Sequence, residues 1–189
     1  MLGVFPGSFN PPTVAHLAIA AAAVSACPLD RVDLCVSRVA LGKESVEHPR
    51  FEDRIAVLEL LRMSRPWLGL RITESRLLVD IAQGYDWLIL GADKWAQIMD
   101  RVWYGGSDER RDEAVRRLPR IAVAARAPFA VPENGLLLDI DPSQIEGVSS
   151  TAARGGATWW MVEEAARFAQ RTGAWIDVAR YERERVSDR

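Results

Sequence analysis

A chain of 189 residues with 49% hydrophobic content has the length and apolar content of one compact domain, so we predict that residues 1–189 form a single domain. The formal net charge of −2 balances 24 basic against 26 acidic residues, which excludes the strongly basic surface of a duplex-binding protein. The two cysteines, Cys27 and Cys35, form no CxxC pair, so neither a disulfide framework nor a zinc site is expected.

The apolar stretch at residues 14–27 is not predicted to be a secretory signal. No Lys or Arg precedes it, Pro11 and Pro12 break its start, and His16 lies inside it. No other run reaches the roughly 18 apolar residues that a membrane span requires. We therefore expect a soluble, cytoplasmic protein with neither a membrane nor a nucleic acid as partner, while self-association into a homo-oligomer is left open.

Short β-rich runs alternate with helical patterns along the chain. Strands are predicted at residues 2–5, 32–37, 68–73, 87–90 and 121–125, with a sixth at 136–140. Helices are predicted at residues 13–26, 51–63, 94–100, 108–117 and 158–171. The last helix is expected to be capped by Thr158 and stopped by Gly173, and the charged tail at 181–189 is expected to fray.

This alternation is typical of an α/β protein, here a single Rossmann-like domain with a doubly wound, mainly parallel sheet and a C-terminal helical segment. In such folds ligands bind outside the carboxyl ends of the strands. The loops that follow the strands are therefore the places where functional residues are expected.

The loop at residues 6–12 follows the first strand and leads into a helix. Gly7 permits close backbone approach, Ser8 offers a hydroxyl, and the start of the helix presents unpaired N–H groups, which together favour a polyphosphate. Thr13 and His16 are three residues apart, so both side chains are expected to face the loop and contact phosphate. A lone histidine among apolar residues is more often a core residue, but its position directly after this loop favours a role in binding.

A second polar group of residues occurs far downstream, at residues 148–154. Three hydroxyl side chains are predicted at the start of a helix, with an arginine about one turn later: Ser149, Ser150, Thr151 and Arg154. Hydroxyls and a guanidinium in this arrangement suit phosphate oxygens. The simpler alternative is ordinary capping of a helix by Ser or Thr.

These two segments resemble the motifs of a known family. The run GSFNPPTVAHL at residues 7–17 resembles the (H/T)xGH signature of adenylyl- and cytidylyltransferases, and VSSTAAR at residues 148–154 resembles their ISSTxxR motif. In that family the first loop and its final histidine hold a nucleoside triphosphate. The resemblance therefore implies a nucleotidyltransferase in which Gly7, Ser8 and Phe9 bind the nucleotide, and His16, Thr13 and Arg154 act in catalysis.

Further residues resemble sequence elements of the nicotinate mononucleotide adenylyltransferases in particular. The run LGAD at residues 90–93 looks like their GAD element, which implies that Gly91 and Asp93 lie near the bound nucleotide. Trp103 follows at the position of an aromatic residue that would stack on a pyridine ring, although Trp95 competes for this role. Packing in the core is the simpler interpretation of either tryptophan, and capping of a helix that of Asp93.

Basic residues complete the implied site. Lys43, together with Arg54 on the following helix, falls where the family has basic residues between its second strand and second helix. Arg126 resembles the arginine at the end of the family's fifth strand and is expected to reach the triphosphate. An exposed cation is otherwise most often only solvated.

The resemblance implies transfer of AMP from ATP to a small phosphorylated acceptor, nicotinate mononucleotide, which yields a dinucleotide (deamido-NAD) and pyrophosphate. Mg²⁺ would accompany ATP and be held mainly by substrate and water, with no metal-ligating residues in the protein. Three departures keep alternatives open. Thr13 replaces the first histidine, as in phosphopantetheine adenylyltransferases, and Ala15 replaces the motif's glycine, which would weaken triphosphate binding. The acceptor-side segment at residues 76–80 lacks the Tyr-Thr pair expected before its acidic residue. Another adenylyl- or cytidylyltransferase, or a degenerate homologue that only binds nucleotide, therefore remains an alternative.

Overall fold

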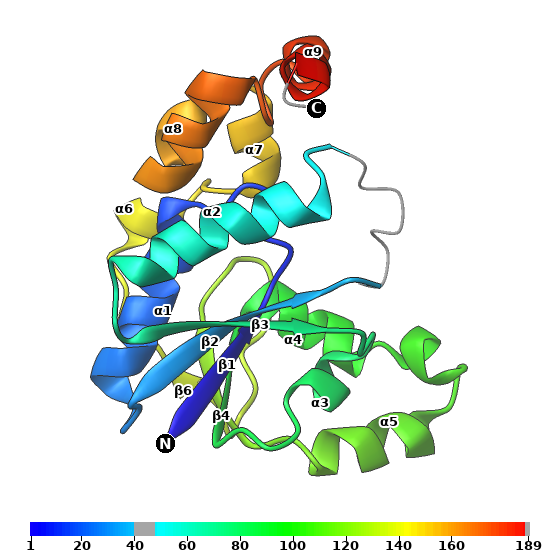
Figure 1. Cartoon of the computed structure of the whole chain (residues 1–189). Coiled ribbons are helices and arrows are strands. Elements are labelled where there is room, and N and C mark those ends of the chain that lie inside the picture. The colour runs from blue at the N-terminus through cyan, green and yellow to red at the C-terminus, as the bar shows by residue number, and fades with distance from the viewer. Residues whose placement is uncertain (40–47, 188–189) are drawn as a thin grey trace.

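A parallel β-sheet lies at the centre of the computed structural model, which describes residues 1–39 and 48–187 (Figure 1). Its strands are β1 (Leu2–Pro6), β2 (Arg31–Ser37), β3 (Leu68–Thr73), β4 (Trp87–Gly91), β5 (Arg120–Ala124) and β6 (Leu136–Leu137). They lie in the order β3-β2-β1-β4-β5-β6, and every neighbouring pair is parallel. The α/β Rossmann-like fold class is thereby confirmed, and the strand order reverses between β1 and β4.

Helices cover both faces of this sheet. The longer helices are α1 (Val14–Ala26), α2 (Phe51–Met63), α4 (Ala92–Met99), α5 (Asp108–Arg116) and α8 (Glu163–Thr172), and a single turn forms α3 (Leu78–Ile81). On one face α1, α2 and α8 pack through residues such as Ala20, Leu58 and Ala165, whereas α3, α4 and α5 pack on the other through residues such as Val79 and Ile98. Because both faces are covered, a central strand is continuously apolar, as WLIL in β4 illustrates.

The C-terminal segment differs from the prediction in two places. The predicted helix at 158–171 is divided into the short turn η2 (Thr158–Trp160) and α8, whose N-cap is Val162 and not Thr158. The division arises because Met161 pairs with Thr13 in an antiparallel bridge and the backbone N–H of Val162 donates to the carbonyl of Pro12, which draws the chain out of the helix. Gly173 ends α8 with φ 81°, as predicted.

The charged tail is the second difference, because it is helical as α9 (Val178–Ser187). Tyr181 explains this order: its side chain is buried, its hydroxyl accepts from the backbone N–H of Arg50 at 3.0 Å, and it donates to Asp53. The remaining short elements are η1 (Arg101–Tyr104), α6 (Pro142–Ile145) and α7 (Ser150–Arg154). The sixth strand is shorter than the predicted 136–140.

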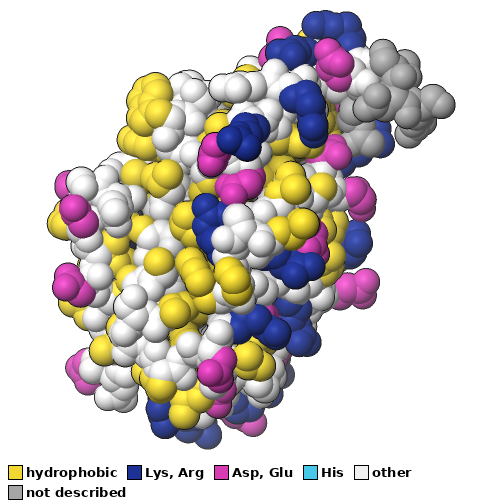
Figure 2. All heavy atoms as spheres, turned by 60° about the vertical axis from the view of Figure 1, so that its left-hand side comes forward, with side chains coloured by type: hydrophobic (Ala, Val, Ile, Leu, Met, Phe, Trp, Pro, Cys, Tyr) yellow, Lys and Arg dark blue, Asp and Glu magenta, His cyan; other side chains and the backbone are white. Residues whose placement is uncertain are grey.

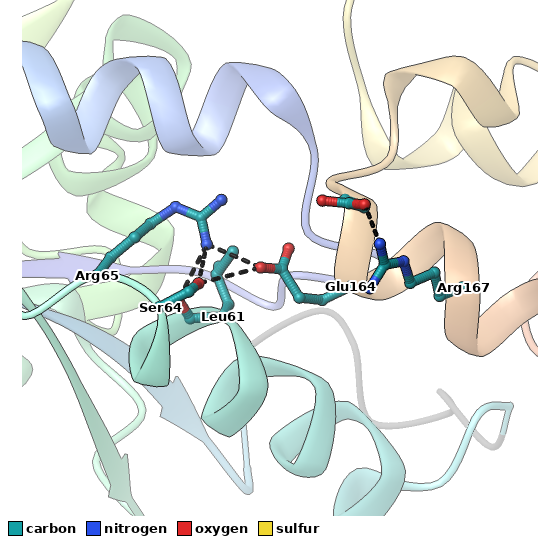
Figure 3. Close-up of polar contacts among 6 residues, drawn as sticks. Leu61, Ser64, Arg65, Glu164 and Arg167 are labelled. Atoms are coloured by element: carbon teal, nitrogen blue, oxygen red, sulfur yellow. Dashed lines mark hydrogen bonds and ion pairs between the residues drawn. The ribbon is translucent and has the colours of Figure 1, made fainter.

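A polar cluster fastens α8 to the end of α2 (Figure 3). The Arg65 guanidinium donates to the Glu164 carboxylate at 2.8 Å, to the Ser64 hydroxyl at 2.6 Å and to the carbonyl of Leu61 at 3.1 Å. Partial burial raises the pKa of Glu164, but the hydrogen bonds from Arg65, the backbone and Ser64 lower it by more, so the net pKa lies below its ordinary value. Glu164 is therefore a carboxylate that the folded protein holds in its charged form.

The face of the molecule shown in Figure 2 mixes hydrophobic, basic and acidic side chains. This mixture agrees with the small formal net charge of −2. Within residues 1–39 and 48–187, helices of the length and apolarity needed to cross a membrane are absent.

Candidate functional site

A cavity of about 660 Å³ opens at the carboxyl ends of β1 and β4, where the strand order reverses. This volume is within the roughly 300–1,000 Å³ range of small-molecule sites. Its walls come from four regions. They are the loop at residues 6–12, called the β1 loop from here on, the first turn of α1, the β4–α4 junction and the segment that leads into α7. His16 and Arg154 both line it, so the two segments singled out in the sequence meet at one site.

The β1 loop is shaped by Phe9, which is 1% exposed and has a positive φ of 43°. Its ring packs against Gly7, where an added Cβ would lie 2.8 Å from the ring edge. No side chain fits at Gly7 without displacing Phe9, so the glycine is required by close approach. The Phe9 ring also lies edge-on to the imidazole of His16, with 5.0 Å between the ring centroids. Phe9 thus packs against both the β1 loop and the imidazole of His16.

Thr13 and His16 form a reciprocal cap at the start of α1. The backbone N–H of Thr13 donates to Nδ1 of His16 at 3.0 Å, and the Thr13 hydroxyl lies 2.8 Å from the same nitrogen. Because a backbone N–H can only donate, Nδ1 is the acceptor and the neutral ring carries its proton on Nε2. Thr13 is buried, and it lines the same cavity as His16.

The hydroxyls around α7 are already engaged, each in a different way. Ser149 is the N-cap, and its oxygen accepts from the backbone N–H of Ala152, so its own hydrogen is left to donate. Ser150 donates to the carbonyl of Pro11 at 2.8 Å, which ties α7 to the β1 loop. Thr151 accepts from Arg154 at 3.3 Å and also keeps its hydrogen. Ser149 therefore caps the helix, and Ser149 and Thr151 each keep a hydroxyl hydrogen that can be donated to an anion.

Side chains from other parts of the chain form hydrogen bonds with residues of the β1 loop. Arg154 donates to the carbonyl of Asn10, and the indole N–H of Trp175 donates to the Asn10 side-chain oxygen at 2.5 Å. Arg54 donates to the carbonyl of Ser8 at 3.3 Å, and burial lowers the pKa of its guanidinium without removing its charge. The contribution of Trp175 was missed in the sequence, because its partner lies in a segment distant along the chain.

The β4–α4 junction brings Gly91, Asp93 and Arg126 to the same cavity. The carboxylate of Asp93 lies 3.7 Å from the Arg126 guanidinium, and Arg126 also donates to the carbonyl of Val148 at 3.4 Å. A Cβ on Gly91 would lie 2.6 Å from the Asp93 carboxylate, so a side chain there would displace this carboxylate from its position. Asp93 lies inside the first turn of α4, and Gly91 is the N-cap.

A second, smaller cavity of about 70 Å³ lies beside the first. The two share Pro6, Gly7, Ser8 and Lys94. Its other lining residues come from β2, α4 and the chain around α3, namely Cys35, Ser37, Arg76, Leu78, Ile81 and Gln97. Burial raises the pKa of the Cys35 thiol to about 11, so this thiol is neutral at physiological pH. Lys94 and Arg76 are cations that were not predicted from the sequence, since neither lies in a recognisable motif.

The tryptophan proposed from the sequence does not join this group. Trp103 packs against the hydrophobic cluster formed by α3, α4 and α5, as does Trp95, and neither lines the two cavities just described. Stacking of Trp103 on a ligand stays a prediction. Lys43 lies outside the described residues.

Metal-ligating side chains do not cluster in the described part of the chain: no group of three or more His, Cys, Asp or Glu residues there is arranged to hold a metal ion. Asp93 is the carboxylate at the larger cavity, and it faces Arg126.

The fold and this cavity define an α/β protein with a nucleotide-sized, cation-rimmed pocket at the switch point of its sheet. The family model described as cytidylyltransferase-like matches residues 4–156, and the chain belongs to this family of the nucleotidyltransferase superfamily. A relative from Bacteroides thetaiotaomicron, described as a probable nicotinate-nucleotide adenylyltransferase, is 32% identical over 153 residues, covering 71% of this chain and 69% of the relative.

Proposed function

We propose that this nucleotidyltransferase transfers AMP from ATP to nicotinate mononucleotide, giving deamido-NAD and pyrophosphate. One observation carries the proposal: His16 and Arg154, which belong to two separate motifs, line a single cavity of about 660 Å³. The name of the Bacteroides thetaiotaomicron relative supports the choice of acceptor. A neighbouring cavity lined by Arg76 and Lys94 would suit the anionic part of such an acceptor.

In the proposed reaction, an oxygen of the acceptor's phosphate forms a bond to the α-phosphorus of ATP. The bond from this phosphorus to the β-phosphate oxygen breaks, and pyrophosphate leaves with the electron pair. A phosphate monoester has a second pKa of about 6, so the attacking oxygen is ionised at neutral pH and no general base is needed. Catalysis then depends on orienting the two phosphates and on balancing their charge.

His16 would donate from Nε2 to an oxygen of the α- or β-phosphate, since its Nδ1 is occupied by Thr13. Thr13 would act through His16 as a positioning residue. Arg154 would bind the departing pyrophosphate, together with the hydroxyls of Ser149 and Thr151. Mg²⁺ would bind the phosphates and neutralise part of their charge.

The remaining predicted residues would shape the nucleotide side. Gly7 and Ser8 would let the phosphates approach the backbone of the β1 loop, and Phe9 would hold this loop in place. Gly91, Asp93 and Arg126 would border the nucleotide from the β4–α4 side. Lys43 stays a proposed contributor on sequence grounds alone.

The test measures pyrophosphate release from ATP or CTP with a panel of acceptors that includes nicotinate mononucleotide, phosphopantetheine and simple phosphate monoesters. We expect turnover with ATP and nicotinate mononucleotide. Activity only with another acceptor would contradict the proposed specificity. Calorimetric binding of ATP without pyrophosphate release from any acceptor would instead identify a degenerate homologue, in which Ala15 has replaced the motif's glycine.

A further inference from the structure

Lys94 occupies a position that no motif assigns. It lies in the first turn of α4, directly after β4, and it lines both cavities at the carboxyl edge of the sheet. Among residues 1–39 and 48–187, the two cavities otherwise share Pro6, Gly7 and Ser8 of the β1 loop. Lys94 is therefore the cation located where the contents of the two cavities would meet.

The surroundings of Lys94 leave its charge available. Its ammonium group donates to the side-chain oxygen of Gln97 at 3.0 Å, and no ion pair joins it to a carboxylate within residues 1–39 and 48–187. The neighbouring carboxylate of Asp93 faces Arg126 instead. A cation in the first turn of a helix is also opposed by the helix dipole, which favours negative charge there. Lys94 thus gains little electrostatic stabilisation from the described residues, and a bound anion would provide the partner for its charge.

Lysine is rare in this chain. Its basic residues number 24, and only Lys43 and Lys94 are lysines, so arginine serves almost everywhere else. An ammonium is a compact point charge on a flexible stem, whereas a guanidinium is a planar fork suited to bidentate pairing. A narrow position between two phosphates favours the compact group.

We propose that Lys94 contacts both substrates where they meet, the α-phosphate of the nucleotide and the phosphate of the acceptor. This inference rests on the proposed nucleotidyl transfer. The reaction must bring two anions within bonding distance, and a cation that touches both lowers their repulsion as the new P–O bond forms. Lys94 would then affect turnover more than the affinity for ATP.

The first experiment maps amine reactivity in the intact protein. Limiting reductive methylation, read by peptide mass spectrometry, labels Lys43, Lys94 and the N-terminal amine. With a non-hydrolysable ATP analogue at ten times its Kd, we expect labelling of Lys94 to fall about tenfold, in proportion to the unoccupied fraction. The N-terminal amine, which pairs with Asp30, is the internal control and should keep its reactivity. Unchanged labelling of Lys94 in nucleotide-saturated protein would overturn the inference.

The second experiment compares variants in the acceptor assay. Lys94→Met is expected to lower kcat about a hundredfold, as loss of an oriented transition-state donor does, with a much smaller change in the Kd for ATP. Lys94→Arg should recover part of the rate. Arg101→Met removes an exposed cation outside both cavities and should leave kcat unchanged.

The outcomes separate the two proposals. Active wild-type protein with an equally active, folded Lys94→Met variant would overturn the role of Lys94 alone. Wild-type protein that neither binds nucleotide nor releases pyrophosphate with any acceptor would overturn the proposed function, and this inference with it.

Discussion

The two cavities at the carboxyl edge of the sheet are built in different ways. Most of the lining of the larger one comes from two contiguous segments, the β1 loop with the start of α1 and the segment around α7, which Ser150 and Arg154 join to each other. The smaller one collects single side chains from β2, α4 and the chain around α3. A site made of contiguous segments leaves a readable pattern in the sequence, whereas a site made of scattered residues does not.

The largest expected effect concerns the larger cavity. We predict that His16→Ala lowers kcat by at least about a hundredfold, because it removes a donor held in a fixed tautomer toward the phosphates. Steady-state pyrophosphate release measures this. His48→Ala is the matched control, since the other histidine pairs with Glu182 and lines neither cavity. Near-normal turnover of a folded His16→Ala variant would remove His16 from the mechanism.

The second prediction concerns the smaller cavity. Arg76→Ala should raise the KM for the acceptor about tenfold, the loss expected for one charge-assisted contact, while the KM for ATP stays the same. Arg117→Ala, which removes an exposed cation beyond α5, is the control. An equal rise in both KM values would mean that the two cavities do not separate the two substrates.

The residues of the two cavities also differ in how far the sequence could predict them. The sheet, its strand positions and the convergence of His16 and Arg154 were predictable, since apolar runs mark buried parallel strands and the carboxyl edge gathers the loops. Lys94 and Arg76 were not, because isolated cations on a helix or loop resemble solvated surface residues.

The C-terminal segment shows the same limit for the fold. Helix α8 was predicted from its pattern, but its start was not, because the Thr13–Met161 bridge that divides it joins residues far apart in the sequence. The contact from Trp175 to Asn10 was missed for the same reason. Local patterns identify elements, and long-range contacts decide where they end.

The third prediction concerns Ala15 in the larger cavity and its effect on the affinity for ATP. Ala15 lines this cavity with a methyl group where the family motif has glycine. Ala15→Gly should lower the Kd for ATP a few-fold by allowing closer approach of the phosphates, and it should cost up to about 1 kcal/mol of stability because glycine disfavours a helix. Calorimetry and thermal unfolding measure the two effects. Weaker ATP binding in a folded Ala15→Gly variant would show that the methyl group contributes to the site.

The smallest effect concerns the attachment of α8, away from both cavities. Glu164→Gln should destabilise the protein by about 1–2 kcal/mol at pH 7, since it removes a charge-assisted contact with Arg65. The folded-state pKa of Glu164 lies below its ordinary value of 4.5, so its stabilisation is complete above that pH and is lost as the pH falls through the folded pKa. Denaturant unfolding of wild type and variant should therefore converge in acid.

Glu163→Gln is the control for this stability measurement. Its carboxylate pairs with Arg167 in a contact where both side chains are more than two-thirds exposed, so its loss should change the unfolding free energy far less. Equal losses from the two substitutions would show that the contact between α2 and α8 is no stronger than an ordinary surface ion pair.

The most direct test of the proposed triphosphate site is the crystal structure of a complex with a non-hydrolysable ATP analogue and Mg²⁺. We predict that the phosphate chain lies in the larger cavity, within hydrogen-bonding distance of Nε2 of His16 at one end and of the Arg154 guanidinium at the other. A nucleotide bound elsewhere on the protein, or phosphates in this cavity that contact neither side chain, would contradict the account.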